Sequence, residues 1–124
     1  MAVRSVRGAI DVPENTRDAI LQAGTRMLNE LVRANGVEVS QVVAAFFSAT
    51  ADLNAAAPAE AARALGWKQA ALHCFQEMHV EGVMPKCLRV TVLWETDRPQ
   101  SEMKHCYLGK AAQLRPDLHS SEGQ

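Results

Sequence analysis

Two arginines, Arg7 and Arg89, stand inside apolar stretches of the sequence that otherwise read as buried strands. An acid, Glu77, interrupts a third stretch of the same kind. A guanidinium group is costly to remove from water unless an anion meets it. A single strand arginine is more often a rim residue paired with a local acid. Two of them in so short a chain nevertheless predict a pocket that holds an anionic ligand.

The other side chains that could do chemistry have simpler interpretations. Taken alone, Cys74 is typical of a small buried residue and Tyr107 of a half-buried core ring. The histidines and cysteines lack the spacing of a zinc site. The sequence has no Gly-rich phosphate loop, no GxSxG nucleophile motif and no paired carboxylates. We therefore predict no metal and no organic cofactor, and chemistry that depends on shape and electrostatics.

Length and composition predict one globular domain. With 124 residues, 48% of them apolar, the chain can form one core but has little room for a second. A net charge of −1, with Lys and Arg scattered along the chain, argues against nucleic-acid binding. No apolar run reaches the roughly 18 residues of a membrane helix, and the N-terminus does not resemble a signal peptide. Three cysteines without a CxxC pair predict free thiols, so we expect a cytoplasmic protein.

The first half of the chain reads as strand, helix, strand. Several β-branched residues in rough alternation predict a strand over residues 3–12. Asn15 or Thr16 can cap a long amphipathic helix, which Gly36 is placed to end. Residues 42–50 are nearly all apolar, as in a strand buried on both faces, although periodicity alone leaves a buried helix open.

The second half adds three more strands and short helical pieces. Pro58 at a first helical position predicts a short helix over residues 58–65. In the strand predicted over residues 87–96, Arg89 alternates with apolar neighbours and faces away from Trp94. The remaining predicted elements are a strand over residues 70–78, a helical turn over 101–104 and a short strand over 105–108. We expect a single domain of residues 1–118, followed by a polar, disordered tail over 119–124.

These elements predict an α+β protein with a mixed five-stranded sheet, one long helix and short helical turns. The long helix can cover only one face of the sheet. We expect the other face to carry Phe46 or Phe47, and Trp94 with them. Self-association is the simplest cover for such a face, and it would place any site on that face at a subunit interface.

The order of several short motifs resembles the small monofunctional chorismate mutases of the AroH class. The likeness runs from Val3 to about Leu118. No single motif is specific to the family. Eight motifs in the same order over almost the whole chain make the resemblance specific. They are Val3-Arg4-Ser5-Val6-Arg7-Gly8-Ala9, Ser48-Ala49-Thr50-Ala51-Asp52-Leu53, Pro58-Ala59 with Arg63, Gly66-Trp67, Cys74-Phe75-Gln76-Glu77-Met78, Lys86-Cys87-Leu88-Arg89-Val90, His105-Cys106-Tyr107-Leu108 and Leu114-Arg115-Pro116-Asp117-Leu118.

The resemblance implies a homotrimer that forms a pseudo-α/β barrel, with three sites in the clefts between neighbouring subunits. The implied reaction is the Claisen rearrangement of chorismate to prephenate, at the branch of aromatic amino-acid biosynthesis towards phenylalanine and tyrosine. This reaction is unimolecular and pericyclic, and it uses no covalent intermediate, metal or organic cofactor.

The resemblance also assigns roles to individual residues. Arg89 would donate to the ether oxygen, where negative charge grows as the C–O bond breaks, and would touch a carboxylate. Arg7 and the Tyr107 hydroxyl would hold the carboxylate of the enolpyruvyl side chain. Ionised Glu77 would accept a hydrogen bond from the ring hydroxyl, which Cys74 would also contact. These contacts would hold the flexible substrate in its compact, reactive conformer.

Further residues would complete the wall of the site. Arg63, from the adjacent subunit, would lie near the ring carboxylate. Ala59, His73, Leu114 and the apolar Ala57 would lie around the substrate.

Two positions depart from the family pattern. Family members commonly have an aromatic residue where this chain has Ala57, and a lysine where it has Glu60. The first change removes packing against the ligand, and the second places an acid near a dianionic substrate. We therefore leave Glu60 out of the predicted site.

Two other functions fit parts of this pattern. A trimeric imine hydrolase of the YjgF type has a similar barrel and an arginine for a carboxylate, but it does not need Glu77 and Cys74 together opposite a ring hydroxyl. The other alternative is a non-catalytic trimer that binds carboxylates as a regulator of the same pathway. Conversion of chorismate would separate the mutase from both.

Overall fold

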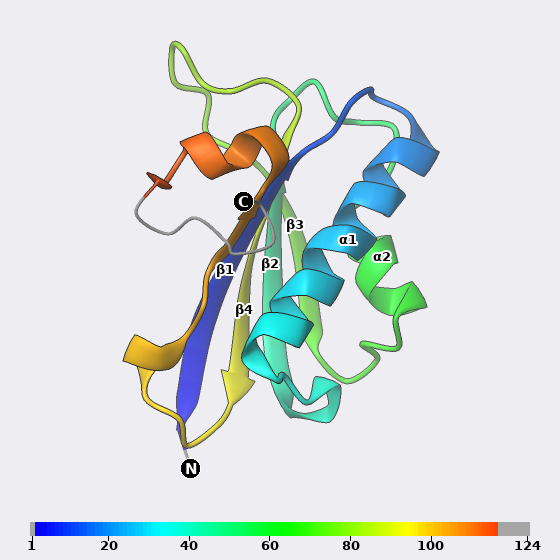
Figure 1. The fold of residues 1–124 in the computed structure, drawn as a ribbon. Coiled ribbons are helices and arrows are strands. Elements are labelled where there is room, and N and C mark those ends of the chain that lie inside the picture. The colour runs from blue at the N-terminus through cyan, green and yellow to red at the C-terminus, as the bar shows by residue number, and fades with distance from the viewer. Residues whose placement is uncertain (1, 117–124) are drawn as a thin grey trace.

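The computed structural model describes residues 2–116 and shows a five-stranded sheet with two helices on one face (Figure 1). The strand order is β3-β2-β4-β1-β5. The elements are β1 (Val3–Asp11), α1 (Arg17–Asn35), β2 (Val42–Ala49), α2 (Ala59–Ala64), β3 (Ala71–Gln76), β4 (Cys87–Glu95) and β5 (Cys106–Leu108), with 3₁₀ turns η1 (Val39–Gln41), η2 (Gln100–Glu102) and η3 (Gly109–Gln113).

The sheet is mixed, as the sequence predicted. The central strand β4 pairs antiparallel with β1 and β2, whereas β5 pairs parallel with β1, and β3 pairs parallel with β2. The α+β class and the order of elements are confirmed. The predicted third strand was too long, because β3 ends at Gln76 and Glu77 lies just beyond it. The Glu77 amide still donates to the Ala49 carbonyl at 2.8 Å, so the acid stays beside β2.

Both ends of the long helix carry the predicted caps. Thr16 is the N-cap, and its hydroxyl oxygen accepts a hydrogen bond from the Ala19 amide at 3.2 Å. Gly36 ends the helix with φ of 64°, a left-handed conformation that glycine adopts without steric strain. The local sequence therefore sets the length of α1.

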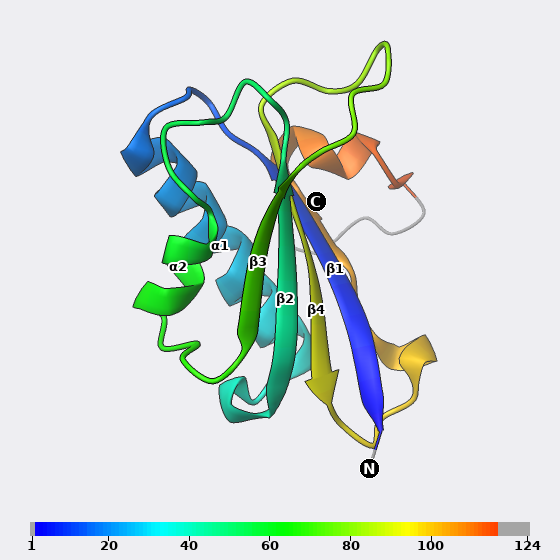
Figure 2. The ribbon, with the colours of Figure 1, turned by 180° about the vertical axis from the view of Figure 1, so that it is seen from behind.

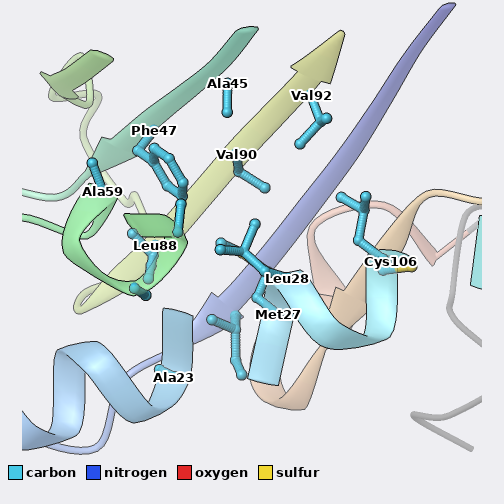
Figure 3. Close-up of a cluster of buried hydrophobic side chains, with 14 of the residues drawn as sticks. Ala23, Met27, Leu28, Ala45, Phe47, Ala59, Leu88, Val90, Val92 and Cys106 are labelled. Atoms are coloured by element: carbon cyan, nitrogen blue, oxygen red, sulfur yellow. The ribbon is translucent and has the colours of Figure 1, made fainter. Parts of the chain in front are cut away.

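The hydrophobic core lies between the sheet and the two helices. Figure 3 shows α1 side chains, among them Met27 and Leu28, facing Val90 and Val92 of β4 and Phe47 of β2. All of these side chains are essentially inaccessible to solvent. The burial of this apolar surface is the largest favourable contribution to the free energy that keeps both helices packed on the sheet.

The opposite face of the sheet has little cover within the chain (Figure 2). Large apolar side chains remain exposed there, with Phe46 at 37% and Phe75 at 56% of full exposure. The expectation that β2 is buried on both faces is therefore wrong for the single chain. Trp94 was also assigned to the wrong face: it is only 3% exposed and belongs to the core on the helix side.

Asn35 joins the end of α1 to the segment before β5. Its side-chain amide donates to the carbonyls of Leu31 and Lys104, and its oxygen accepts from the Lys104 amide at 2.7 Å. We expect Asn35→Ala to lower the free energy of unfolding by about 2 kcal/mol, because buried partners lose their hydrogen bonds. Chemical denaturation would measure this. Asn29→Ala, at an exposed position of the same helix, is the control, and an equal effect of both variants would contradict the prediction.

Neither helix in the described part of the chain has the length and apolar content of a membrane span.

Candidate active site

The strand register places Arg89 and Tyr107 on the uncovered face of the sheet. Ala9 of β1 is the partner of Arg89 in β4 and of Tyr107 in β5, so these three side chains form one row across neighbouring strands. Arg7 lies two residues before Ala9 and therefore points to the same side. Two guanidinium groups and a phenol thus share one small area, as the anion-pocket prediction requires.

Glu77 meets Arg89 at this face. The distance from Glu77 Oε1 to Arg89 Nε is 3.5 Å. The same carboxylate oxygen accepts a hydrogen bond from the Ser48 hydroxyl at 2.7 Å. Ser48 was not among the predicted site residues, although it is the one hydroxyl side chain in the otherwise apolar strand β2. That departure from the pattern could have identified it.

The start of β4, which sets the position of Arg89, is held by a turn around Asp52. Lys86 precedes β4 in a left-handed conformation, with φ of 48°. Its amide donates to both carboxylate oxygens of Asp52, at 3.1 and 3.0 Å. Thr50 donates to the same carboxylate and accepts from the Cys87 amide. The Thr50 hydrogen bond, more than any other contact, lowers the pKa of Asp52.

Tyr107 is packed into a small second cluster at the end of this face. Ala9, Cys87 and Ala111 are its buried neighbours, and Leu114, which directly follows η3, packs against the cluster. The Asp11 carboxylate fixes η3 by accepting a hydrogen bond from the Lys110 amide at 2.7 Å. Leu114, one of the residues expected in the wall of the site, therefore lies in the same cluster as Tyr107.

Cys87 lies on the same face of β4 as Arg89, in the cluster of Tyr107. Burial raises the pKa of the Cys87 thiol, despite the opposing effect of the nearby Arg89 guanidinium. The thiol is thus neutral at physiological pH and adds no competing anion beside Arg89.

Cys74 and Arg89 lie on opposite faces of the sheet. Cys74 is the register partner of Phe47, whose side chain is fully buried under the helices. Cys74 lines a cavity of about 240 Å³ with Ala57 and Pro58. Strands β3 and β1 are three positions apart in the sheet, or about 14 Å at the usual strand spacing. Within one chain, a small ligand could not contact Cys74 and Arg7 together.

The other predicted residues lie on the same half of the molecule as Cys74. Arg63 lines a separate cavity of about 420 Å³ with Trp67 and Lys68. Ala59 is 4% exposed and packs in the main core, so its side chain does not face the Cys74 cavity. His73 lies on the open face at β3.

His73 belongs to an aromatic cluster on that face. Its ring is 5.7 Å from the ring of Phe46 and 6.0 Å from that of Phe75, measured between centroids. The rings of Phe46 and Phe75 are themselves 6.4 Å apart. An exposed aromatic cluster of this size is typical of a surface that another molecule covers.

Glu60, which we left out of the predicted site, pairs with helix α1. Its carboxylate lies 2.6 Å from the Arg17 guanidinium. Arg17 therefore compensates part of the negative charge that the sequence places near the expected ligand.

His105 supports Arg7 through the backbone. The Arg7 amide donates to His105 Nδ1 at 3.0 Å, so the bond needs a neutral imidazole. Burial lowers the pKa of His105 from its ordinary value of 6.5, and the cations of Arg7 and Arg115 lower it further. This side-chain hydrogen bond lies next to the first register pair of β1 and β5, Gly8 with Cys106, at the position where Arg7 reaches the open face.

A pH dependence of stability follows from His105. Its pKa is lower in the folded than in the unfolded state, so both states are neutral above pH 6.5 and only the unfolded state gains a proton just below it. We expect the free energy of unfolding to fall as the pH decreases below 6.5. Denaturation of the wild type and of His105→Gln at a series of pH values would test this. Identical slopes for the two proteins would contradict it.

The described residues contain no group of three or more His, Cys, Asp or Glu side chains that could hold a metal ion. The open face itself offers the guanidinium groups of Arg7 and Arg89 and the Tyr107 hydroxyl, with the Glu77 carboxylate beside them.

Known proteins match this chain over nearly its whole length. The profile of the family described as chorismate mutase type I matches residues 3–118. The chorismate mutase AroH of Thermus thermophilus is 44% identical over 121 residues, which cover 97% of this chain and 99% of the relative. The chorismate mutase AroH of Bacillus subtilis (strain 168) is 42% identical over 119 residues, which cover 95% and 94%.

A solved structure agrees with these matches. The chorismate mutase from Clostridium thermocellum superposes with a TM-score of 0.87 and 40% sequence identity, over 89% of this chain and 98% of that one. The class of protein is therefore an isomerase. More particularly, the chain belongs to the type I chorismate mutases, which confirms the resemblance and favours it over the imine hydrolase and the non-catalytic trimer.

Proposed function

We propose that this protein rearranges chorismate to prephenate at the open face of its sheet. The observation that carries the proposal is the row of Arg89 and Tyr107 across neighbouring strands, with Arg7 on the same face and Glu77 in contact with Arg89. Chorismate is a dianion, and two guanidinium groups with a phenol match its carboxylates. The reaction needs no group transfer, because one C–O bond breaks and one C–C bond forms within the same molecule.

Arg89 provides electrostatic stabilisation of the transition state. Negative charge grows on the ether oxygen as the C–O bond breaks, and a fixed cationic donor stabilises that charge more in the transition state than in the substrate. Arg89 Nε is buried and has no hydrogen-bond partner among the described residues, because the 3.5 Å to Glu77 is too long for a hydrogen bond. A donor of this kind is available to a ligand.

The other groups hold the substrate. Arg7 and the Tyr107 hydroxyl bind the carboxylate of the enolpyruvyl side chain, and the ionised Glu77 accepts a hydrogen bond from the ring hydroxyl. Leu114 packs beside Tyr107 and forms an apolar wall of the proposed site. Holding the compact conformer converts binding energy into orientation, which lowers the barrier of a unimolecular reaction.

A neighbouring subunit completes the site. Cys74 and Arg63 lie on the far half of each chain, and a second copy can bring them to the first copy's arginines. The aromatic cluster of Phe46, His73 and Phe75 is the surface that such a contact would bury. We propose a homotrimer whose subunits share a pseudo-α/β barrel with three active sites. Each active site is built from two subunits, and Ala59 and His73 lie near its wall.

Incubation with chorismate tests the activity. We expect the diene absorbance of chorismate to decrease with time in proportion to enzyme concentration, with no change in mass, because prephenate is an isomer. A rate equal to that of buffer alone would contradict the proposal. Small-angle scattering on the same sample tests the assembly: it should give the mass of three chains, and a monomer would contradict the shared site.

Glu60 offers a prediction on substrate binding. We expect Glu60→Lys to lower KM while kcat barely changes, because a cation replaces an acid near a dianionic ligand outside the reacting atoms. Steady-state kinetics with chorismate would measure both constants. Glu60→Gln is the matched control, since it removes the charge and the Arg17 ion pair without adding a cation. An unchanged or higher KM for the lysine variant would contradict the prediction.

A further inference from the structure

Ser48 occupies an unusual place in β2. The strand is otherwise built from apolar residues, and Ser48 is the register partner of Arg89 in β4. Its side chain therefore lies on the open face beside the Arg89 guanidinium. The Ser48 hydroxyl donates to Glu77 Oε1 at 2.7 Å, the length of a strong hydrogen bond to a carboxylate.

Ser48 and Arg89 share one oxygen of Glu77. Oε1 receives the Ser48 hydroxyl at 2.7 Å and lies 3.5 Å from Arg89 Nε, whereas Oε2 has no hydrogen-bond partner among the described residues. A carboxylate next to a guanidinium normally closes to a direct, often bidentate hydrogen bond. Here the serine holds Oε1 outside that distance.

We propose that Ser48 is a positioning residue that keeps Glu77 from neutralising Arg89. By anchoring Oε1 it leaves Arg89 Nε free for the ether oxygen, and it directs Oε2 towards the ring hydroxyl. Without the serine, Glu77 would close on Arg89 and occupy the donors that the transition state needs. This inference rests on the proposed roles of Glu77 and Arg89.

Kinetics of two Ser48 variants and one control variant test the inference. We expect Ser48→Ala to lower kcat about tenfold or more, the usual effect of a lost hydrogen bond to a charged group, with a smaller change in KM. Ser48→Thr keeps the hydroxyl and should keep most of the activity. Thr91→Val is the matched control, because it removes a hydroxyl from the same face of β4 and should leave kcat near the wild-type value.

A double-mutant cycle separates positioning from a structural role. If Ser48 acts through the carboxylate, Ser48→Ala should cause little further loss of kcat in a Glu77→Ala background, measured at raised enzyme concentration. An equal loss in both backgrounds, or an unchanged kcat in Ser48→Ala, would overturn the proposal. If Glu77→Ala and Arg89→Lys both retained full activity, the proposed site itself would be wrong, and the role of Ser48 would fail with it. Scattering and thermal unfolding of each variant exclude loss of the fold as the cause.

Discussion

Replacement of Arg89 by lysine is expected to lower kcat by about two to three orders of magnitude, or roughly 3–4 kcal/mol in the barrier. Lysine keeps the positive charge but loses the planar fork, and its ammonium does not place a donor where Arg89 Nε lies. Because the interaction is made mainly in the transition state, kcat should fall far more than KM rises. Steady-state conversion of chorismate measures both.

Arg4→Lys is the control for this variant. Arg4 is a strand arginine of β1, whose register partner is Trp94 of β4. Its Nε donates to the Arg98 carbonyl at 2.8 Å, away from Glu77. It should retain near wild-type kcat. A kcat close to normal in a correctly folded Arg89→Lys protein would show that the role assigned to Arg89 is wrong.

Arg7→Ala is expected to reduce kcat/KM by about 10- to 100-fold, the effect of losing a hydrogen-bonded cation from a carboxylate. Much of this loss should be in KM, because Arg7 binds a carboxylate that does not react. The backbone bond from the Arg7 amide to His105 is retained in the variant, so the strand pairing should survive.

Arg7→Lys separates charge from geometry. The kcat/KM of Arg7→Lys should lie between those of the wild type and Arg7→Ala, because the lysine ammonium attracts the carboxylate but cannot bind it bidentately. Wild-type kcat/KM in Arg7→Ala would contradict the proposed carboxylate contact.

The elements of the fold could be predicted because their signals are local. Thr16 and Gly36 mark the ends of α1, and alternation along β4 separates Arg89 from the core side chains. The helix caps and the alternation depend on neighbouring residues alone. The α+β class and the mixed sheet follow from the order of these elements and from their number.

The details of the site could not be predicted, because they depend on register between distant strands. Nothing local to Ser48 indicates that it faces Arg89, or that Glu77 falls just past the end of β3. Trp94 was misplaced for a related reason: its apolar character fits either face, and packing against the helices decides between them. The opposed directions of Cys74 and Arg89 also follow only from the observed pairing.

The burial of one face of the sheet supports the proposed position of the site at a subunit interface. The helices cover one face of the sheet, so cations on that side would be surrounded by core residues. On the other face they meet solvent in the single chain, with the Arg89 side chain 36% exposed. A neighbouring subunit would exclude that water, and electrostatic stabilisation is stronger where water is excluded.

A crystal structure of the assembled protein with prephenate bound is the most direct measurement of the central claim. We predict that Arg7 and Arg89 of one subunit both donate to the ligand, while Cys74 and Arg63 approach it from the neighbouring subunit. A ligand bound elsewhere, or both guanidinium groups turned to bulk water or paired only with acids of their own chain, would contradict the account.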